Sequence, residues 1–116
     1  DATVLEQAAR AAGMTTLFLV FRGPGPAWVA GTPTREQPLW DEHAAFMDHL
    51  FEQGRVVLGG PYADYSLNLV VVEGRDVKEV TDLFRDDPWA GGVLDLPEVT
   101  EWTFFLDSRA QPGSQR

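Results

Sequence analysis

Both histidines of the chain, His43 and His49, lie in the segment WDEHAAFMDHLFEQGRVVLGGP, which covers residues 40–61. Histidine gains and loses a proton readily near neutral pH, so it serves as a general acid or base and as a metal ligand. Six positions along a helix turn the chain by about 600°, which places the two rings on different sides. A metal ion shared between them is excluded, and each histidine must be judged by itself.

His43 falls in the apolar stripe of a predicted helix, whereas His49 lies among polar residues on the opposite side and is predicted to be solvated. A buried imidazole that finds no hydrogen-bond partner costs about 1–3 kcal/mol. His43 is therefore either a satisfied core residue or a functional residue that faces a cleft, and the pattern alone leaves both open. The other members of the stripe are Leu39, Phe46, Met47 and Leu50.

Alternating strands and helices must position these residues. Apolar and β-branched runs predict strands at residues 15–22, 55–62, 66–73 and 98–107. One helix is predicted to begin between Thr34 and Pro38 and to end at Gly54. The capping-box spacing of Asp76 and Glu79 opens a second helix. The order β-α-β-β-α-β predicts an α+β, ferredoxin-like sandwich with both helices on one face of a four-stranded sheet.

The first predicted strand is apolar on both of its faces. One face carries Leu17, Leu19 and Phe21, and the other carries Phe18 and Val20. The two helices can cover only one side of the sheet. A second copy of the same sheet would bury the other side, so we expect a homodimer.

The bulk composition limits the classes of partner. The 116 residues, 44% of them apolar, predict one globular domain, and the lack of cysteine excludes disulfides, zinc–thiolate sites and thiol nucleophiles. With 18 acidic and 9 basic residues, the net charge of −9 disfavours nucleic acid and anionic membranes as partners. The longest apolar run, residues 17–21, is too short to span a bilayer. Residues 1–13 lack a signal-peptide pattern as they stand, and we predict a cytoplasmic protein.

Several motifs together carry a resemblance to a known family. They are His43 eleven residues before Gly54, GRVVLGGP (54–61), LNLVVVEG (67–74), DPWAGGVL (87–94) and a closing strand with Trp102 near its middle. With this combination, residues 14–102 resemble the YCII-related (YciI-like) domains of the dimeric α+β barrel superfamily, which also includes muconolactone isomerase. We expect such a domain at residues 14–107, a helical extension at 1–13 and a polar tail at 108–116. The Gly/Pro-rich loop at 23–34 is longer than is usual in that family.

The resemblance implies an active-site dyad made of His43 and Asp87. An aspartate that accepts a hydrogen bond from one ring nitrogen fixes the tautomer and leaves the other nitrogen to move protons. Such chemistry suits isomerisation, or elimination of a leaving group, on a small cyclic molecule, without a cofactor or a metal. Asp87 also suits a second role, as the cap of a helix that Pro88 would open.

The candidate substrate-binding residues are neighbours of this dyad in the motifs. Gly60 and Pro61 end a strand where small residues let a ligand approach the backbone, although they suit a simple turn equally well. Tyr62 and Trp89 would line a pocket for a small ring-shaped ligand, or would pack as core or dimer contacts. Arg55 would hold a carboxylate, or would only decorate the start of its strand.

Three functions from different classes follow from these patterns. The first is a cofactor-independent isomerase or lyase that uses His43 and Asp87 as an acid–base pair. The second is a binding or accessory module that holds a small molecule without turnover. The third is a haem-dependent or oxygenase-type member of the same superfamily with His43 as an axial ligand, which rests on fold analogy alone.

Overall fold

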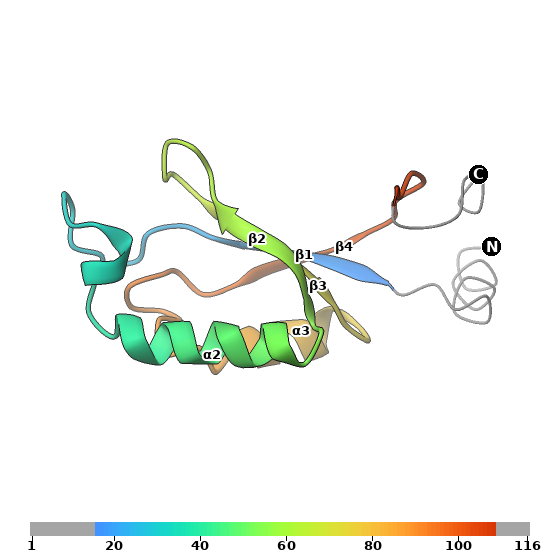
Figure 1. Cartoon of the computed structure of the whole chain (residues 1–116), viewed down its shortest axis with the longest axis horizontal. Helices are drawn as coiled ribbons and strands as arrows, with labels where there is room; N and C mark the ends of the chain where they lie inside the picture. Colours follow the sequence, from blue (N-terminus) through green and yellow to red (C-terminus); the bar gives the residue numbers. More distant parts are fainter. Residues whose placement is uncertain (1–15, 109–116) are drawn as a thin grey trace.

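The computed structural model describes residues 16–108, and its strands and helices follow the predicted order (Figure 1). The strands are β1 (Leu17–Arg22), β2 (Val56–Pro61), β3 (Asn68–Glu73) and β4 (Glu98–Trp102). The helices are the 3₁₀ turn η1 (Thr34–Glu36), α2 (Trp40–Glu52) and α3 (Val77–Arg85). The predicted leading helix, and all of the predicted tail except Ser108, lie outside the described residues. None of the described helices is long and apolar enough to cross a membrane.

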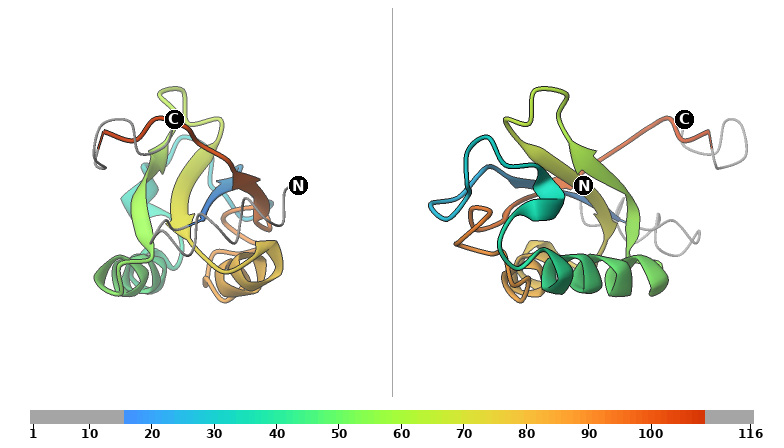
Figure 2. Two further views of the ribbon diagram at one scale, coloured as in Figure 1. Left: turned by 90° about the vertical axis from the view of Figure 1, so that its right-hand side faces the viewer. Right: turned by 60° about the vertical axis from the view of Figure 1, so that its left-hand side comes forward.

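The four strands form one antiparallel sheet in the order β2-β3-β1-β4, in which β2 and β3 make the predicted hairpin. Both helices lie on the same face of this sheet, as the two views in Figure 2 show. The arrangement confirms the predicted α+β, ferredoxin-like sandwich. The buried core between helices and sheet consists of Phe18, Val20, Leu50, Val70, Val72, Val80 and Phe84.

Helix α2 begins later than the sequence predicted. A start between Thr34 and Pro38 is wrong, because η1 is only a short 3₁₀ turn and the α-helix begins at Trp40. Leu39, with a φ of 60°, adopts a left-handed conformation that an α-helix does not contain. Leu39 is also 53% exposed, so it does not belong to the buried stripe. The predicted end is confirmed, since Gly54 follows the helix with a φ of 75°.

Strand β4 is shorter than predicted, and Trp102 ends it instead of lying near its middle. Trp102 pairs with Leu17, which is the first residue of β1. A strand at the edge of a sheet can form its ladder only as far as its neighbour extends. The predicted continuation of the strand to residue 107 is therefore wrong.

The sheet face opposite the helices, here called the open face, is mainly apolar. Its apolar residues are Leu17, Leu19, Phe21, Leu58, Leu69, Val71 and Trp102, and Glu73, Glu98 and Thr100 lie on the same face. Leu19 pairs with Val71, and both alternate with residues that point into the core. Leu58 pairs with Val71 from the other side and is 64% exposed. One chain thus presents apolar side chains on a face that no described helix covers.

The long loop between β1 and η1 is held against the loop that follows α3. The backbone N–H of Gly25 donates to Val93 O, and that of Ala27 donates to Gly92 O, each over 2.9 Å. The two loops approach so closely that a Cβ at Gly25 would lie 2.2 Å from Gly92 O. Only glycine fits there, and its contact fixes the path of the loop that carries Trp28.

Replacement of Gly25 by alanine is expected to lower the free energy of unfolding by about 1–3 kcal/mol, because the clash is with backbone atoms that cannot rotate away. Urea denaturation measures this loss. Gly23→Ala is the matched control, since a Cβ at Gly23 meets nothing closer than 3.4 Å. Equal stability of the two variants would show that the loop yields without cost.

Candidate functional site

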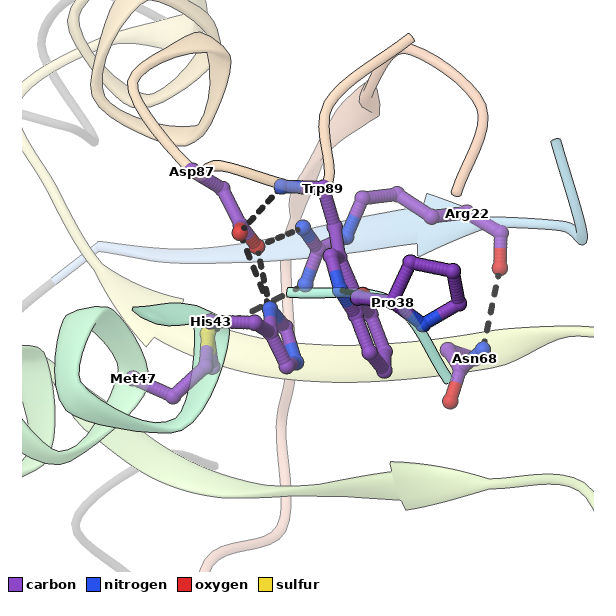
Figure 3. Close-up of polar contacts among 7 residues, drawn as sticks. All are labelled: Arg22, Pro38, His43, Met47, Asn68, Asp87 and Trp89. Atoms are coloured by element: carbon purple, nitrogen blue, oxygen red, sulfur yellow. Dashed lines mark hydrogen bonds and ion pairs between the residues drawn. The ribbon is translucent and has the colours of Figure 1, made fainter. Parts of the chain in front are cut away.

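Three charged or titratable side chains meet between the sheet and the helices (Figure 3). Arg22 ends β1 on its core side, His43 lies in the first turn of α2, and Asp87 follows α3. The Nδ1 atom of His43 lies 2.9 and 2.8 Å from the two carboxylate oxygens of Asp87. The Nη1 atom of Arg22 lies 2.5 Å from Oδ2 of the same carboxylate. The side chains of Arg22 and Asp87 are 2% and 0% exposed.

Asp87 does not cap a helix. The chain turns after it, and the backbone N–H of Trp89 donates to Oδ1 of Asp87 over 2.9 Å. The N–H of Ala90 donates to the carbonyl of Asp87, also over 2.9 Å. An aspartate whose side chain accepts from a backbone N–H two residues ahead forms an Asx turn. The prediction that Pro88 opens a helix is therefore wrong, because this turn aims the carboxylate back at His43 and Arg22.

The carboxylate of Asp87 is held in its ionised form. Burial raises the pKa of Asp87, but hydrogen bonds from His43, the Trp89 backbone and Arg22, together with the charge of Arg22, lower it further than burial raises it. The resulting pKa lies below the ordinary value of 3.8. An ionised carboxylate can only accept hydrogen bonds. Nδ1 of His43 therefore carries the proton it donates to Asp87.

The lowered pKa of Asp87 predicts how stability changes in acid. Such a carboxyl stabilises the fold above its unfolded-state pKa, and the contribution is lost as the pH falls through the folded-state value. For aspartate this loss lies below about pH 4. We expect urea midpoints to fall more steeply there in the natural protein than in Asp87→Asn, whose amide does not titrate. Parallel curves for the two proteins would contradict the assignment.

The second ring nitrogen of His43, Nε2, is available for chemistry. No described residue hydrogen-bonds it, and it is not one of the buried unpaired polar atoms of the described chain. The His43 side chain is 11% exposed, while its partner Asp87 is fully covered. The ring thus has one nitrogen fixed in the interior and one that reaches solvent.

Tryptophans surround the His43 ring. Trp89 stacks on it in parallel, with ring centroids 3.9 Å apart and an angle of 3° between the planes. Trp40 lies 5.8 Å from His43 and 5.7 Å from Trp89, and Trp28 meets Trp89 edge-on at 6.4 Å. The indole N–H of Trp89 donates to the carbonyl of Pro38 over 2.6 Å, which fixes the stacked ring. The stacked indole therefore fixes the plane of the imidazole.

The other predicted site residues lie in different places. Trp89 is 2% exposed, and its ring stacks on that of His43. Pro61 pairs with Asn68, which pairs with Arg22, so Gly60 and Pro61 lie at the same end of the sheet as Arg22, two strands away. Gly60, Pro61 and Tyr62 are exposed, and no hydrogen bond between described residues joins them to His43. Their role in binding a substrate stays a prediction.

Arg55 lies at the opposite end of the sheet. Its Nη2 atom contacts both carboxylate oxygens of Glu79, at 2.7 and 2.9 Å, and its Nε–H donates to Glu73 O over 3.0 Å. These contacts tie the start of β2 to β3 and to the first turn of α3. The structure does not bring Arg55 together with His43, and we leave it out of the site.

The sequence interpretation missed Arg22, although a signal was present. In the strand LFLVFR, residues 18, 20 and 22 share one face, and Phe18 and Val20 are fully buried. An arginine on the same strand face as two core residues is expected to be buried, and a buried arginine needs a charged partner. His49, by contrast, is exposed, as predicted.

The sequence has one significant match among known proteins, and that match is to a family model. Neither the curated proteins nor the solved structures give a significant one. Among models of protein families, that of the YCII-related domain matches residues 14–103. Within residues 16–108, no three His, Asp or Glu side chains gather as ligands for a metal. Because the match spans most of the sequence and the fold agrees with it, the chain belongs to the YCII-related domain family.

Proposed function

We propose that this protein is a cofactor-independent enzyme of the YciI-like type, an isomerase or lyase that acts on a small cyclic molecule. The observation that carries the proposal is the state of the His43 ring. Its Nδ1 donates to a buried, ionised Asp87, while its Nε2 reaches solvent. General acid–base catalysis requires a fixed, oriented imidazole with one unprotonated ring nitrogen, here called the bare nitrogen.

The proposed cycle moves one proton. Nε2 of His43 removes a proton from a carbon beside a carbonyl group, and the electron pair of the broken C–H bond passes into the carbonyl as an enolate. The imidazolium that forms is stabilised by the Asp87 carboxylate. If the enolate is conjugated with a C=C bond, His43 returns the proton to the far carbon of that system, which isomerises the substrate. In an elimination, the enolate electron pair forms a C=C bond as the bond from the neighbouring carbon to the departing group breaks, and His43 gives the proton to that group.

Hydrogen–deuterium exchange tests this proposal without knowledge of the natural substrate. A panel of small lactones and cyclic ketones is incubated with the protein in D₂O, and proton NMR follows the signals beside the carbonyl. We expect exchange with at least one compound, its loss in His43→Gln, and its retention in His49→Gln, which alters the exposed histidine. Exchange that survives in His43→Gln would refute the role of His43. Binding without exchange would favour the non-catalytic module.

We also propose that two copies of the chain pack through their open faces. The support is the apolar character of that face and the 64% exposure of Leu58 on it. On the same face Leu19, Phe21 and Leu69 are half-buried and Val71 is buried, and a partner sheet would cover the apolar surface that stays exposed. Light scattering should therefore give a dimer mass, and Leu58→Asp should give a monomer. Phe51→Asp, equally exposed at 66% but on helix α2, is the matched control and should stay dimeric.

A further inference from the structure

Arg22 occupies a position that the pattern of its strand reserves for an apolar side chain. It follows Phe18 and Val20 on the core face of β1, and its side chain is 2% exposed. The guanidinium lies over the Phe84 ring, with its central carbon 5.1 Å from the ring centroid. One of its nitrogens also lies 3.9 Å from the sulfur of Met47. These two neighbours of the charge are apolar or only weakly polar.

A purely structural role accounts poorly for this arginine. Its Nε–H is buried and has no hydrogen-bond partner, and among the described residues it is the one buried side-chain polar atom in that state. Buried charge pairs are often no more stabilising than apolar side chains of similar volume. An unpaired buried donor in a native protein calls for an explanation, and a functional site is a frequent one. Packing and hydrogen bonding alone therefore do not explain why a guanidinium occupies this buried position.

Its contact with Asp87 shows what the charge does. Oδ1 of Asp87 accepts from the Trp89 backbone and lies near His43, whereas Oδ2 lies between Arg22 and His43. Among the described residues, the ionisable side chains in contact with Asp87 are Arg22 from β1 and His43 from α2. Arg22 is always charged, whereas His43 is charged only after it has taken up a proton. While His43 is neutral, Arg22 alone balances the carboxylate.

We propose that Arg22 is a positioning residue that fixes the tautomer of His43 through Asp87. With Arg22 in place, Asp87 stays a carboxylate and accepts from Nδ1–H, so Nε2 is the bare nitrogen. Without that charge, a buried carboxylate favours its protonated form, whose O–H donates to Nδ1. The ring proton then resides on Nε2, and the nitrogen that reaches solvent can no longer accept one. The inference rests on the proposed function, because it assigns Nε2 as the base.

Nitrogen NMR of the protein labelled with ¹⁵N-histidine reads the tautomer directly. Only two histidines give signals, and the exposed His49 serves as an internal reference. In the natural protein, the bare nitrogen of neutral His43 should be Nε2. In Arg22→Met and Arg22→Gln it should be Nδ1, or a mixture in which Nδ1 dominates. Arg22→Lys restores the charge beside Oδ2 and should restore the bare Nε2.

Arg55→Met is the matched control, because it removes another arginine that is paired with a carboxylate, at the far end of the sheet. It should leave the His43 signals unchanged. A folded Arg22→Met or Arg22→Gln that keeps the bare Nε2, or an Arg22→Lys that loses it, would overturn the inference.

If neither neutral variant folds, the test is a pH titration of the carboxyl ¹³C signal of Asp87 in the natural protein. We expect that carboxyl to remain ionised below the usual range of aspartate, and protonation within that range would overturn the inference. None of these readouts depends on turnover. The tautomer assignment can therefore fail while the exchange assay succeeds, and the reverse can also occur.

Discussion

Replacement of Asp87 by alanine is expected to lower the free energy of unfolding by about 3–5 kcal/mol. The variant leaves Arg22, whose side chain is 2% exposed, as a charge with no counterion in the interior. It also removes the acceptor for Nδ1 of His43 and for the backbone N–H of Trp89. Each donor would then be buried or half-buried without the partner that satisfied it.

Urea denaturation with tryptophan fluorescence measures this loss, and Asp86→Ala is the matched control. Asp86 is the adjacent residue and the same amino acid, but it is exposed. Its replacement should change stability by no more than about 0.5 kcal/mol. Asp87→Asn should fall between the two, because the amide oxygen can still accept while the negative charge is lost. An Asp87→Ala protein as stable as Asp86→Ala would mean that the three-residue cluster contributes nothing to the fold.

Replacement of Trp89 by alanine should also cost about 3–5 kcal/mol, through the lost burial of a large aromatic side chain and the cavity it leaves. Trp89 is 2% exposed and touches His43, Trp40 and Trp28, so no neighbour can fill its volume without moving. The His43 ring would lose the surface that holds it in plane. We therefore expect both lower stability and a broadened His43 ring signal.

Thermal or urea unfolding, combined with proton NMR, checks both expectations. Trp89→Phe keeps an aromatic face beside His43 but cannot donate to Pro38 O. It should cost less than the alanine variant and retain a sharp His43 signal. Phe51→Ala removes a ring from the surface of α2 that is 66% exposed, and it should change stability little. A sharp His43 signal in Trp89→Ala would show that Asp87 alone orients the imidazole.

The sequence predicted the order of elements and the sheet architecture because these depend on local periodicity. A run of apolar residues identified β1 as a strand, and the spacing of Asp76 and Glu79 marked the start of α3, where the Asp76 side chain accepts from Glu79 N–H over 2.8 Å. The start of α2 was wrong because the left-handed Leu39 resembles an ordinary helical leucine in sequence. A periodic pattern of apolar residues does not reveal that a single residue adopts the left-handed conformation.

The site was harder to predict, because its contacts join distant segments. The pairing of His43 with Asp87 came from family resemblance and not from any pattern in the residues. Arg22 was missed because an arginine at the end of a strand usually extends into solvent, and only the position of Asp87 after α3 gives it a buried partner. The Asp-Pro pair predicted a helix cap from local sequence, but Asp87 instead contacts Arg22 and His43, which are distant in the sequence.

The cluster of Arg22, His43 and Asp87 has a consequence for how the protein folds. Asp87 lies 65 residues from Arg22 and 44 residues from His43 along the chain. Closing loops of that length is slow and entropically costly until the surrounding sheet and helices are in place. The site therefore forms only with the sheet and both helices that carry its residues. A partially folded chain that had formed either helix alone would hold an ordinary solvated histidine, and the oriented imidazole would appear only with the complete native state.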